Sequence, residues 1–148
     1  MLHCLVITLI CTITNFVLSK IAKCPSGWEY FQGSCYQFRD NLKTWSDALA
    51  FCRNYGADLL KISSAEENQF VQRNGKNWWL ALRRDARNTG VWKWNDGSIL
   101  TDTNFWATGE PNNHGNNEHC GQFRDDTRLW NDLHCESLIN VACEKGSF

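Results

Sequence analysis

Apolar side chains recur at helical spacing in two segments of the first half of the chain. In the first segment they fall at every third or fourth position until Gly56 ends the run, at Trp45, Ala48, Leu49, Cys52 and Tyr55. Thr44, with Asp47 three residues later, has the form of a helix N-cap. The same capping form recurs over 64–67, and Asn74-Gly75 ends the second segment. The pattern predicts two short helices, one after Thr44 with Cys52 on its buried face and one over about 65–73.

The other apolar segments are short and separated by turn residues, which is typical of β-strands. Aromatic residues on both sides of Gln32-Gly33 predict a small hairpin within 24–38. A buried strand is expected over 77–82, and another over 91–98 that runs into an Asn-Asp-Gly turn. Short strands are also expected over about 118–124, 129–132 and 139–144. Two helices followed by antiparallel strands predict an α+β fold.

Residues 99–117 are rich in Thr, Asn and Gly, with Phe105 and Trp106 as isolated apolar residues. A segment of this length without secondary structure in a compact domain is usually functional or disordered. The basic stretch 82–90 is interpreted as a solvated connection. Core packing is the favoured interpretation for most of the eight tryptophans, because Trp28, Trp45, Trp79 and Trp92 lie at alternating or helical positions.

The first 19 residues contain no Lys, Arg, Asp or Glu, and several threonines interrupt their apolar run. That composition is poor for a membrane span, whereas Ser19 with Val17 two positions before it suits cleavage by signal peptidase. We expect a secretory signal over 1–19 and one domain over 20–148, in a secreted, extracellular protein without membrane insertion. A short uncleaved anchor is the less favoured alternative.

Charge and cysteine content narrow the partners and the compartment. The formal net charge of −1 argues against a nucleic-acid partner, which would require a basic face. Six cysteines lie outside the predicted signal, and an even set in a secreted domain is typical of disulfides. Fifteen pairings remain open at this point. The six are Cys24, Cys35, Cys52, Cys120, Cys135 and Cys143, and pairing all of them leaves no cysteine for an interchain bridge.

The polar segment EPNNHGNNEHC (Glu110–Cys120), followed by WND (130–132), carries the candidate chemistry. A zinc site is disfavoured. The nearby histidines, His114, His119 and His134, lack a recognised ligand spacing, and Cys120 is better used in a disulfide. A pair of carboxylates could also serve glycoside hydrolysis. Their neighbours are amides and a proline, and no nucleophile motif is present, so we do not expect an enzyme.

A hard cation fits the donors better. Calcium takes six to eight oxygens, mostly from carboxylates and carboxamides. The segment and the following WND offer such oxygens with three formal negative charges, on Glu110, Asn112, Glu118, Asn131 and Asp132. Standing alone, these residues would be interpreted as a solvated polar loop.

They do not stand alone, because several motifs together resemble the C-type lectin domain family from Cys24 to Glu144. The resemblance rests on CPSGWEYFQGSCYQF, on TWSDALAFC followed by GADLLKISSAEEN, and on WLAL, EPN…EHC, WNDLHC and VACE. It implies the disulfides Cys24–Cys35 of long-form domains, Cys52–Cys143 and Cys120–Cys135. It also implies that Pro111 follows a cis peptide bond.

The resemblance further implies a role for each polar residue of the loop. Calcium is held by Glu110, Asn112, Glu118, Asn131 and Asp132, and the same side chains hydrogen-bond a sugar. His114 is expected as a contact with the sugar at the rim. The acid-then-amide order of Glu110 and Asn112 is the family's version for mannose, fucose or N-acetylglucosamine. Asn113 and His119 stand where an auxiliary site would need acids, so we predict one principal Ca²⁺.

The resulting expectation is a calcium-dependent lectin of the mannose type that recognises glycans on cell or microbial surfaces, in innate immunity. The alternative is a protein-binding, venom-like member or an ice-binding member of the same fold. No coiled coil or collagen repeat is present to multiply sites, so any avidity is expected to come from a non-covalent homo-oligomer.

Overall fold

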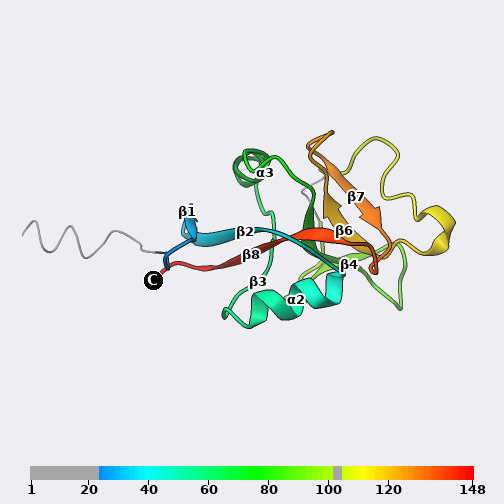
Figure 1. Ribbon diagram of the computed structural model, residues 1–148. Helices are drawn as coiled ribbons and strands as arrows, with labels where there is room; N and C mark the ends of the chain where they lie inside the picture. The colour runs from blue at the N-terminus through cyan, green and yellow to red at the C-terminus, as the bar shows by residue number, and fades with distance from the viewer. Residues whose placement is uncertain (1–23, 102–104) are drawn as a thin grey trace, which may run out of the picture.

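The computed structural model describes residues 24–101 and 105–148, so the predicted signal over 1–19 lies outside the described residues (Figure 1). The described chain contains two α-helices, α2 (Trp45–Arg53) and α3 (Ala65–Gln72), and a 3-10 turn, η1 (His114–Asn116). Its strands are β1 (Glu29–Phe31), β2 (Ser34–Lys43), β3 (Asp58–Leu59), β4 (Trp78–Arg84), β5 (Trp92–Trp94), β6 (Cys120–Phe123), β7 (Trp130–Leu133) and β8 (Ile139–Gly146). The predicted α+β class is confirmed.

The first part of the chain forms a hairpin and a long ladder. β1 and β2 pair antiparallel around Gln32-Gly33, where both residues have positive φ, as the predicted hairpin requires. β2 then pairs along most of its length with β8, from Ser34 opposite Gly146 to Arg39 opposite Val141. The C-terminal strand therefore runs beside the first hairpin, as Figure 1 shows.

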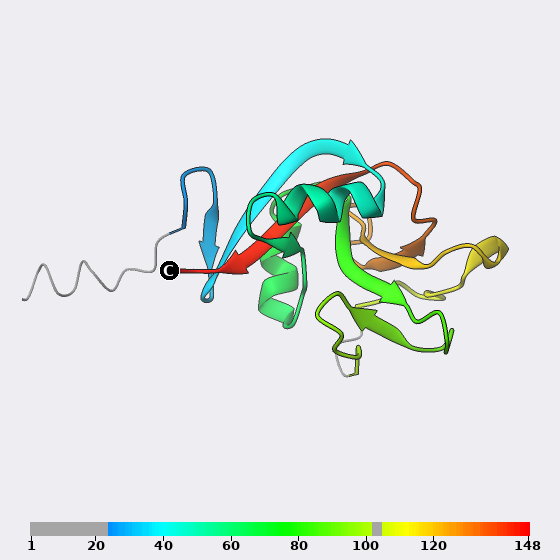
Figure 2. The same cartoon turned by 90° about the horizontal axis from the view of Figure 1, so that it is seen from below.

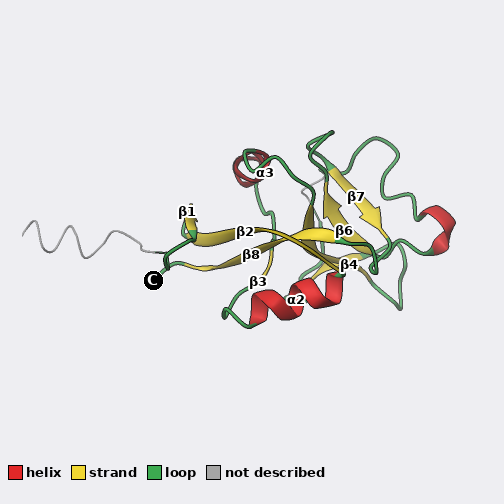
Figure 3. Ribbon diagram, viewed as in Figure 1, coloured by secondary structure: helices red, strands yellow, loops and turns green. Residues whose placement is uncertain are grey.

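The helices begin at the predicted caps. Thr44 Oγ1 accepts a hydrogen bond from Asp47 N at 3.2 Å, and Ser64 Oγ accepts from Glu67 N at 3.1 Å. α2 and α3 lie on opposite sides of the β2–β8 ladder (Figure 3). α2 ends at Arg53, so the predicted run to Tyr55 is too long, and that side chain is 46% exposed.

Beyond the ladder, the sheet continues in the order β1-β2-β8-β4-β6-β7, with β5 on β4 and β3 on β8. β4 joins β8 in parallel at one residue pair, whereas β4–β6 and β6–β7 are antiparallel. The strand predicted within 91–98 is confirmed over 92–94, and the chain then turns at Asn95-Asp96-Gly97 as predicted. β3 was not predicted, because a two-residue strand shows no periodicity.

A core rich in aromatic residues fills the space between these layers. Six of the eight tryptophans are buried, which confirms the packing interpretation for most of them: Trp45, Trp78, Trp79, Trp92, Trp94 and Trp130. Trp28 and Trp106 are partly buried against the same core. Among the described residues, no helix is long and apolar enough to span a bilayer.

The three disulfides have the pairing that the resemblance implied. Cys24–Cys35 closes the N-terminal hairpin, Cys52–Cys143 ties α2 to β8, and Cys120–Cys135 ties β6 to the segment after β7. The cis peptide bond between Glu110 and Pro111 is also present.

Candidate functional site

The predicted donors lie on β7 and on the loop that precedes β6. In Figures 1 and 2 the loop with η1 projects at the end of the molecule opposite the C-terminus. Trp130 holds the start of this loop, because its amide donates to Phe105 O at 2.7 Å and its carbonyl accepts from Ala107 N at 2.8 Å. Cys120, in β6 and opposite Leu133 of β7, holds the end. The loop is therefore fixed at both ends beside the strand that carries Asn131 and Asp132.

Asp132 joins the loop to the strand directly. Its side chain is fully buried, and its two carboxylate oxygens accept from Asn112 N at 3.0 Å and from Asn113 N at 2.8 Å. A buried carboxylate needs such donors to offset the loss of hydration. The backbone just after Pro111 is consequently held against β7.

Glu110 and Asn112 face each other on that backbone. Glu110 Oε2 accepts from Asn112 N at 3.0 Å, and Oε1 accepts from Asn112 Nδ2 at 2.9 Å. Burial and the neighbouring carboxylates of Asp132 and Glu118 raise the pKa of Glu110. Two acids of the loop and one of β7 thus influence one another.

Glu118 closes the loop from its other end. Its carboxylate Oε2 accepts from His114 N at 2.9 Å, and its own amide donates to Asn113 Oδ1 at 3.0 Å. Asn113 and Asn116 both have positive φ, which lets the chain turn around η1. On β7, the side-chain amide of Asn131 donates to the carbonyl of Asp132.

Among the described residues, no histidine joins two other His, Cys, Asp or Glu side chains in a metal-binding group. The His114 side chain is exposed on η1, and its contact with a sugar stays a prediction. Cys120 is bonded to Cys135, which removes its thiolate from any zinc site. The disfavoured zinc interpretation therefore gains nothing from the structure.

The chemistry of these side chains is suited to a hard divalent cation. Carboxylates and side-chain amides are oxygen donors of the kind that calcium prefers, and a cation would favour the ionised form of Glu110, whose pKa is raised by burial and by the neighbouring carboxylates. Within 24–101 and 105–148, no three His, Cys, Asp or Glu side chains form a metal-binding group by themselves. A cation here would therefore depend on the amide oxygens of Asn112 and Asn131 as well.

Sequence reasoning missed Arg84 at this site. The prediction that 82–90 is a solvated connection is wrong for this residue, whose side chain is only 9% exposed and pairs with Asp132 at 2.7 Å. Arg84 follows the buried Leu80 and Leu82 at alternate positions of β4. The period of the strand is the signal that could have placed it on an inward face.

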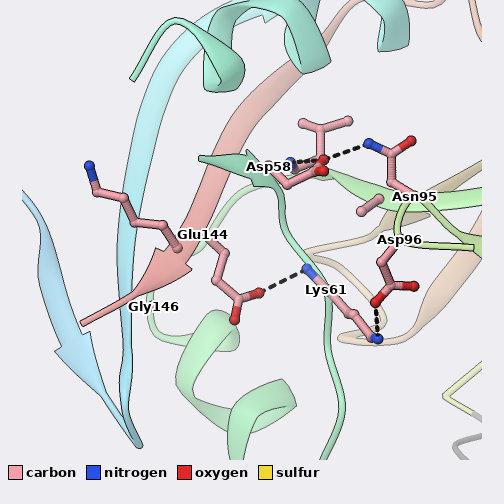
Figure 4. Close-up of a pocket in the computed structure, with 9 residues that line it drawn as sticks. Asp58, Lys61, Asn95, Asp96, Glu144 and Gly146 are labelled. Carbon is pink, nitrogen blue, oxygen red and sulfur yellow. Dashed lines mark hydrogen bonds and ion pairs between the residues drawn. The ribbon is translucent and has the colours of Figure 1, made fainter. Parts of the chain in front are cut away.

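A separate hollow of about 180 Å³ lies between β3, β8 and the turn after β5 (Figure 4). The polar groups that line it are bonded within the protein: Asn95 Nδ2 donates to Asp58 at 2.7 Å, and Lys61 Nζ pairs with Asp96 at 2.6 Å. Glu144 accepts from Lys61 N at 3.1 Å. Because these groups are satisfied within the protein, the hollow is a weaker candidate than the acidic loop.

The chain is similar to known proteins over most of its length. A family model described as "Lectin C-type domain" matches residues 41–145. "CD209 antigen-like protein A" of Mus musculus is 42% identical over 127 residues, which cover 82% of this chain and 52% of the relative. The chain spans about half or less of the curated relatives that it matches first.

Solved structures share the fold. The carbohydrate-recognition domain of cow CD23, determined in the presence of a GlcNAc2Man3 oligosaccharide, has a TM-score of 0.79 against this chain and is 33% identical to it. The match covers 86% of this chain and 98% of that domain. A calcium-independent type II antifreeze protein has a TM-score of 0.78 and 27% identity, covering 86% and 97% respectively. The same fold therefore carries different functions.

Proposed function

Because the chain belongs to the C-type lectin domain family, we propose that it is a calcium-dependent lectin that binds mannose-type glycans. The observation that carries this proposal is the convergence of Glu110, Asn112 and Asp132, with Glu118 held on the same loop by its bonds to His114 and Asn113. Acids and amides from two segments are gathered there without a catalytic arrangement such as a nucleophile beside a base.

Each side chain has a distinct role in the proposed site. Glu110, Asn112, Glu118, Asn131 and Asp132 would hold Ca²⁺, which supplies coordination positions for two neighbouring sugar hydroxyls when it is bound. The carboxylates of Glu110 and Glu118 accept hydrogen bonds from those hydroxyls, and the amides of Asn112 and Asn131 donate to them. An exposed His114 would contact the sugar at the rim.

The biological setting is part of the same proposal. A secreted lectin of this kind would recognise glycans on cell or microbial surfaces in innate immunity. Single sugars are expected to bind weakly, because a shallow site buries little surface. Non-covalent association of copies would supply avidity.

The first test is a glycan array probed with the protein in calcium and in chelator. We expect binding to mannose, fucose or N-acetylglucosamine glycans in calcium, and loss of that binding in chelator. Glu66→Gln, an exposed change on α3, serves as the control and should bind as the parent does. Absence of binding in calcium, or equal binding in chelator, would refute the proposal.

The second test exchanges the acid and the amide. Glu110→Gln combined with Asn112→Asp reverses their order while keeping the size of each side chain. We expect mannose-type binding to fall and galactose binding to rise, because donors and acceptors change places. Surface plasmon resonance with immobilised mannose and galactose measures the ratio, and an unchanged ratio would contradict the assigned geometry.

The alternative is a protein-binding or ice-binding function, and the likeness to the antifreeze protein supports it. Thermal hysteresis, or capture of a protein partner that neither sugar nor chelator affects, would favour this alternative. An enzyme is third, and would require cleavage of a chromogenic glycoside that Glu118→Gln abolishes.

A further inference from the structure

The acidic site contains a cation of its own. Arg84, the last residue of β4, places Nη2 at 2.7 Å from Oδ2 of Asp132. The exposed fractions of the two side chains are 9% and 0%. Removing one partner from such a buried pair leaves an uncompensated charge in the interior. The buried charge of Asp132 is therefore compensated by Arg84.

The guanidinium also connects separate segments of the chain. Nε donates to Glu118 O at 3.2 Å, and Nη1 donates to Thr89 O at 2.7 Å. The group lies 4.7 Å from the ring centroid of Trp92, in a cation–π contact. Every guanidinium nitrogen is engaged, so the orientation of the group is defined by three hydrogen bonds and a ring.

Asp132 connects Arg84 to the loop through hydrogen bonds. Arg84 and Asn113 N share Oδ2 of Asp132, while Oδ1 accepts from Asn112 N. The amides that follow Pro111 therefore depend on a carboxylate that Arg84 holds in place. All of these contacts are made between groups of the protein itself.

Arg84 also changes the net charge of the site. Glu110, Glu118 and Asp132 carry three negative charges, and Arg84 reduces the total to two. That total matches one divalent cation. A second divalent ion would leave the site with a net positive charge and be repelled.

We propose that Arg84 is a positioning residue that acts as a permanent internal counter-cation. It keeps Asp132 and the amides of Asn112 and Asn113 ordered without calcium, and it restricts the site to a single divalent ion. The ion count rests on the proposed function, whereas the ordering of the loop does not.

Hydrogen exchange measured by NMR in chelator tests the ordering. In the parent protein we expect the amides of Asn112 and Asn113 to be protected from exchange. In Arg84→Gln they should exchange at least about tenfold faster in chelator, because the carboxylate that binds them loses its partner. Arg84→Lys, which keeps the charge but not the fork of donors, should give an intermediate rate.

Arg83→Gln is the matched control, since Arg83 is the adjacent residue of β4, is exposed, and lies over the ring of Trp45. It should leave both amides protected. Protection of core amides in β8 verifies that every variant is folded. Unprotected amides in the parent, or equal protection in Arg84→Gln, would overturn the proposed ordering.

Calorimetric titration of the parent protein with CaCl₂ tests the ion count. We expect one Ca²⁺ per chain, and two ions would overturn the restriction. If no calcium binds, the proposed lectin function fails, while the exchange experiment in chelator still decides the role of Arg84. The two failures are therefore distinguishable.

Discussion

At the scale of single residues, the described chain contains a second group of acids, in which the partly buried Glu144 differs from the fully buried Asp132. Glu144 accepts from Ser34 Oγ at 2.9 Å and from Lys61 N at 3.1 Å. The hydroxyl of Tyr36 lies between Glu144 and Glu67, and donates to Glu67 at 2.5 Å. Burial, and then the charge of Glu67, raise the pKa of Glu144 to about 6. Asp132 has an arginine for a partner, whereas Glu144 accepts from neutral donors.

This raised pKa predicts a pH dependence of stability. A carboxyl group that is harder to ionise when folded binds its proton more tightly in the folded state than in the unfolded state. The free energy of unfolding should therefore fall as the pH rises from about 4.5 to about 6, and stay lower above that range. In Glu144→Gln the decrease between about pH 5 and about pH 7 should be smaller by about 1 kcal/mol.

Urea unfolding of both proteins at several pH values, in chelator, measures this difference. Glu66→Gln is the control, because that side chain is exposed and should leave the slope as it is in the parent. A Glu144→Gln variant with the slope of the parent protein would contradict the prediction.

At the scale of elements, the position of the site depends on how closely β6 approaches β4. Gly121 of β6 lies opposite Asp132 of β7 and faces Leu82 of β4. A Cβ at Gly121 would lie 2.9 Å from Cβ of Leu82, closer than side-chain atoms normally come. A larger residue at this position would force β6 and β4 to shift, and β6 lies between β4, which carries Arg84, and β7, which carries Asp132.

Gly121→Ala is therefore expected to lower the free energy of unfolding by about 1–3 kcal/mol. Gly146→Ala is the matched control, because Gly146 is also in a strand and no heavy atom lies within 4 Å of the position that its Cβ would take. That change should alter stability by less than about 0.5 kcal/mol. Guanidinium unfolding midpoints compare the two variants. Equal midpoints would mean that the sheet adjusts to the extra methyl group.

At the scale of the whole molecule, the two ends of the domain are tied together. Cys52 and Cys143 are separated by 91 residues, and their disulfide joins α2 to the last strand. The bridge between Cys24 and Cys35 spans only 11 residues of one hairpin. Cross-linking a longer loop removes more conformational entropy from the unfolded chain.

Replacing Cys52 and Cys143 by Ala should therefore cost more stability than replacing Cys24 and Cys35 by Ala. The loop-entropy relation gives about 4.6 kcal/mol for the first pair and about 2.8 kcal/mol for the second. Urea unfolding of both double variants, in the absence of reductant, measures the order. A larger loss for Cys24 and Cys35 would show that packing, not loop length, dominates these bridges.

Local pattern was sufficient to predict most elements of this fold. The two caps at Thr44 and Ser64, the turn at Gln32-Gly33 and the strands near the C-terminus depend on neighbours in the sequence. The end of α2 and the two-residue β3 were not predicted well, because contacts with other elements decide where a short segment stops.

The sequence by itself determined which oxygen donors the chain has and the family to which they belong, since residue types and spacing suffice for both. Only the tertiary structure decided that Arg84 lies at the same site, where it shares Asp132 with the amides of Asn112 and Asn113. The reason is that β4, the loop and β7 are separated in sequence, and the burial of a charge is defined only when they pack. A basic residue in a basic stretch looks solvated until the carboxylate that it faces is known.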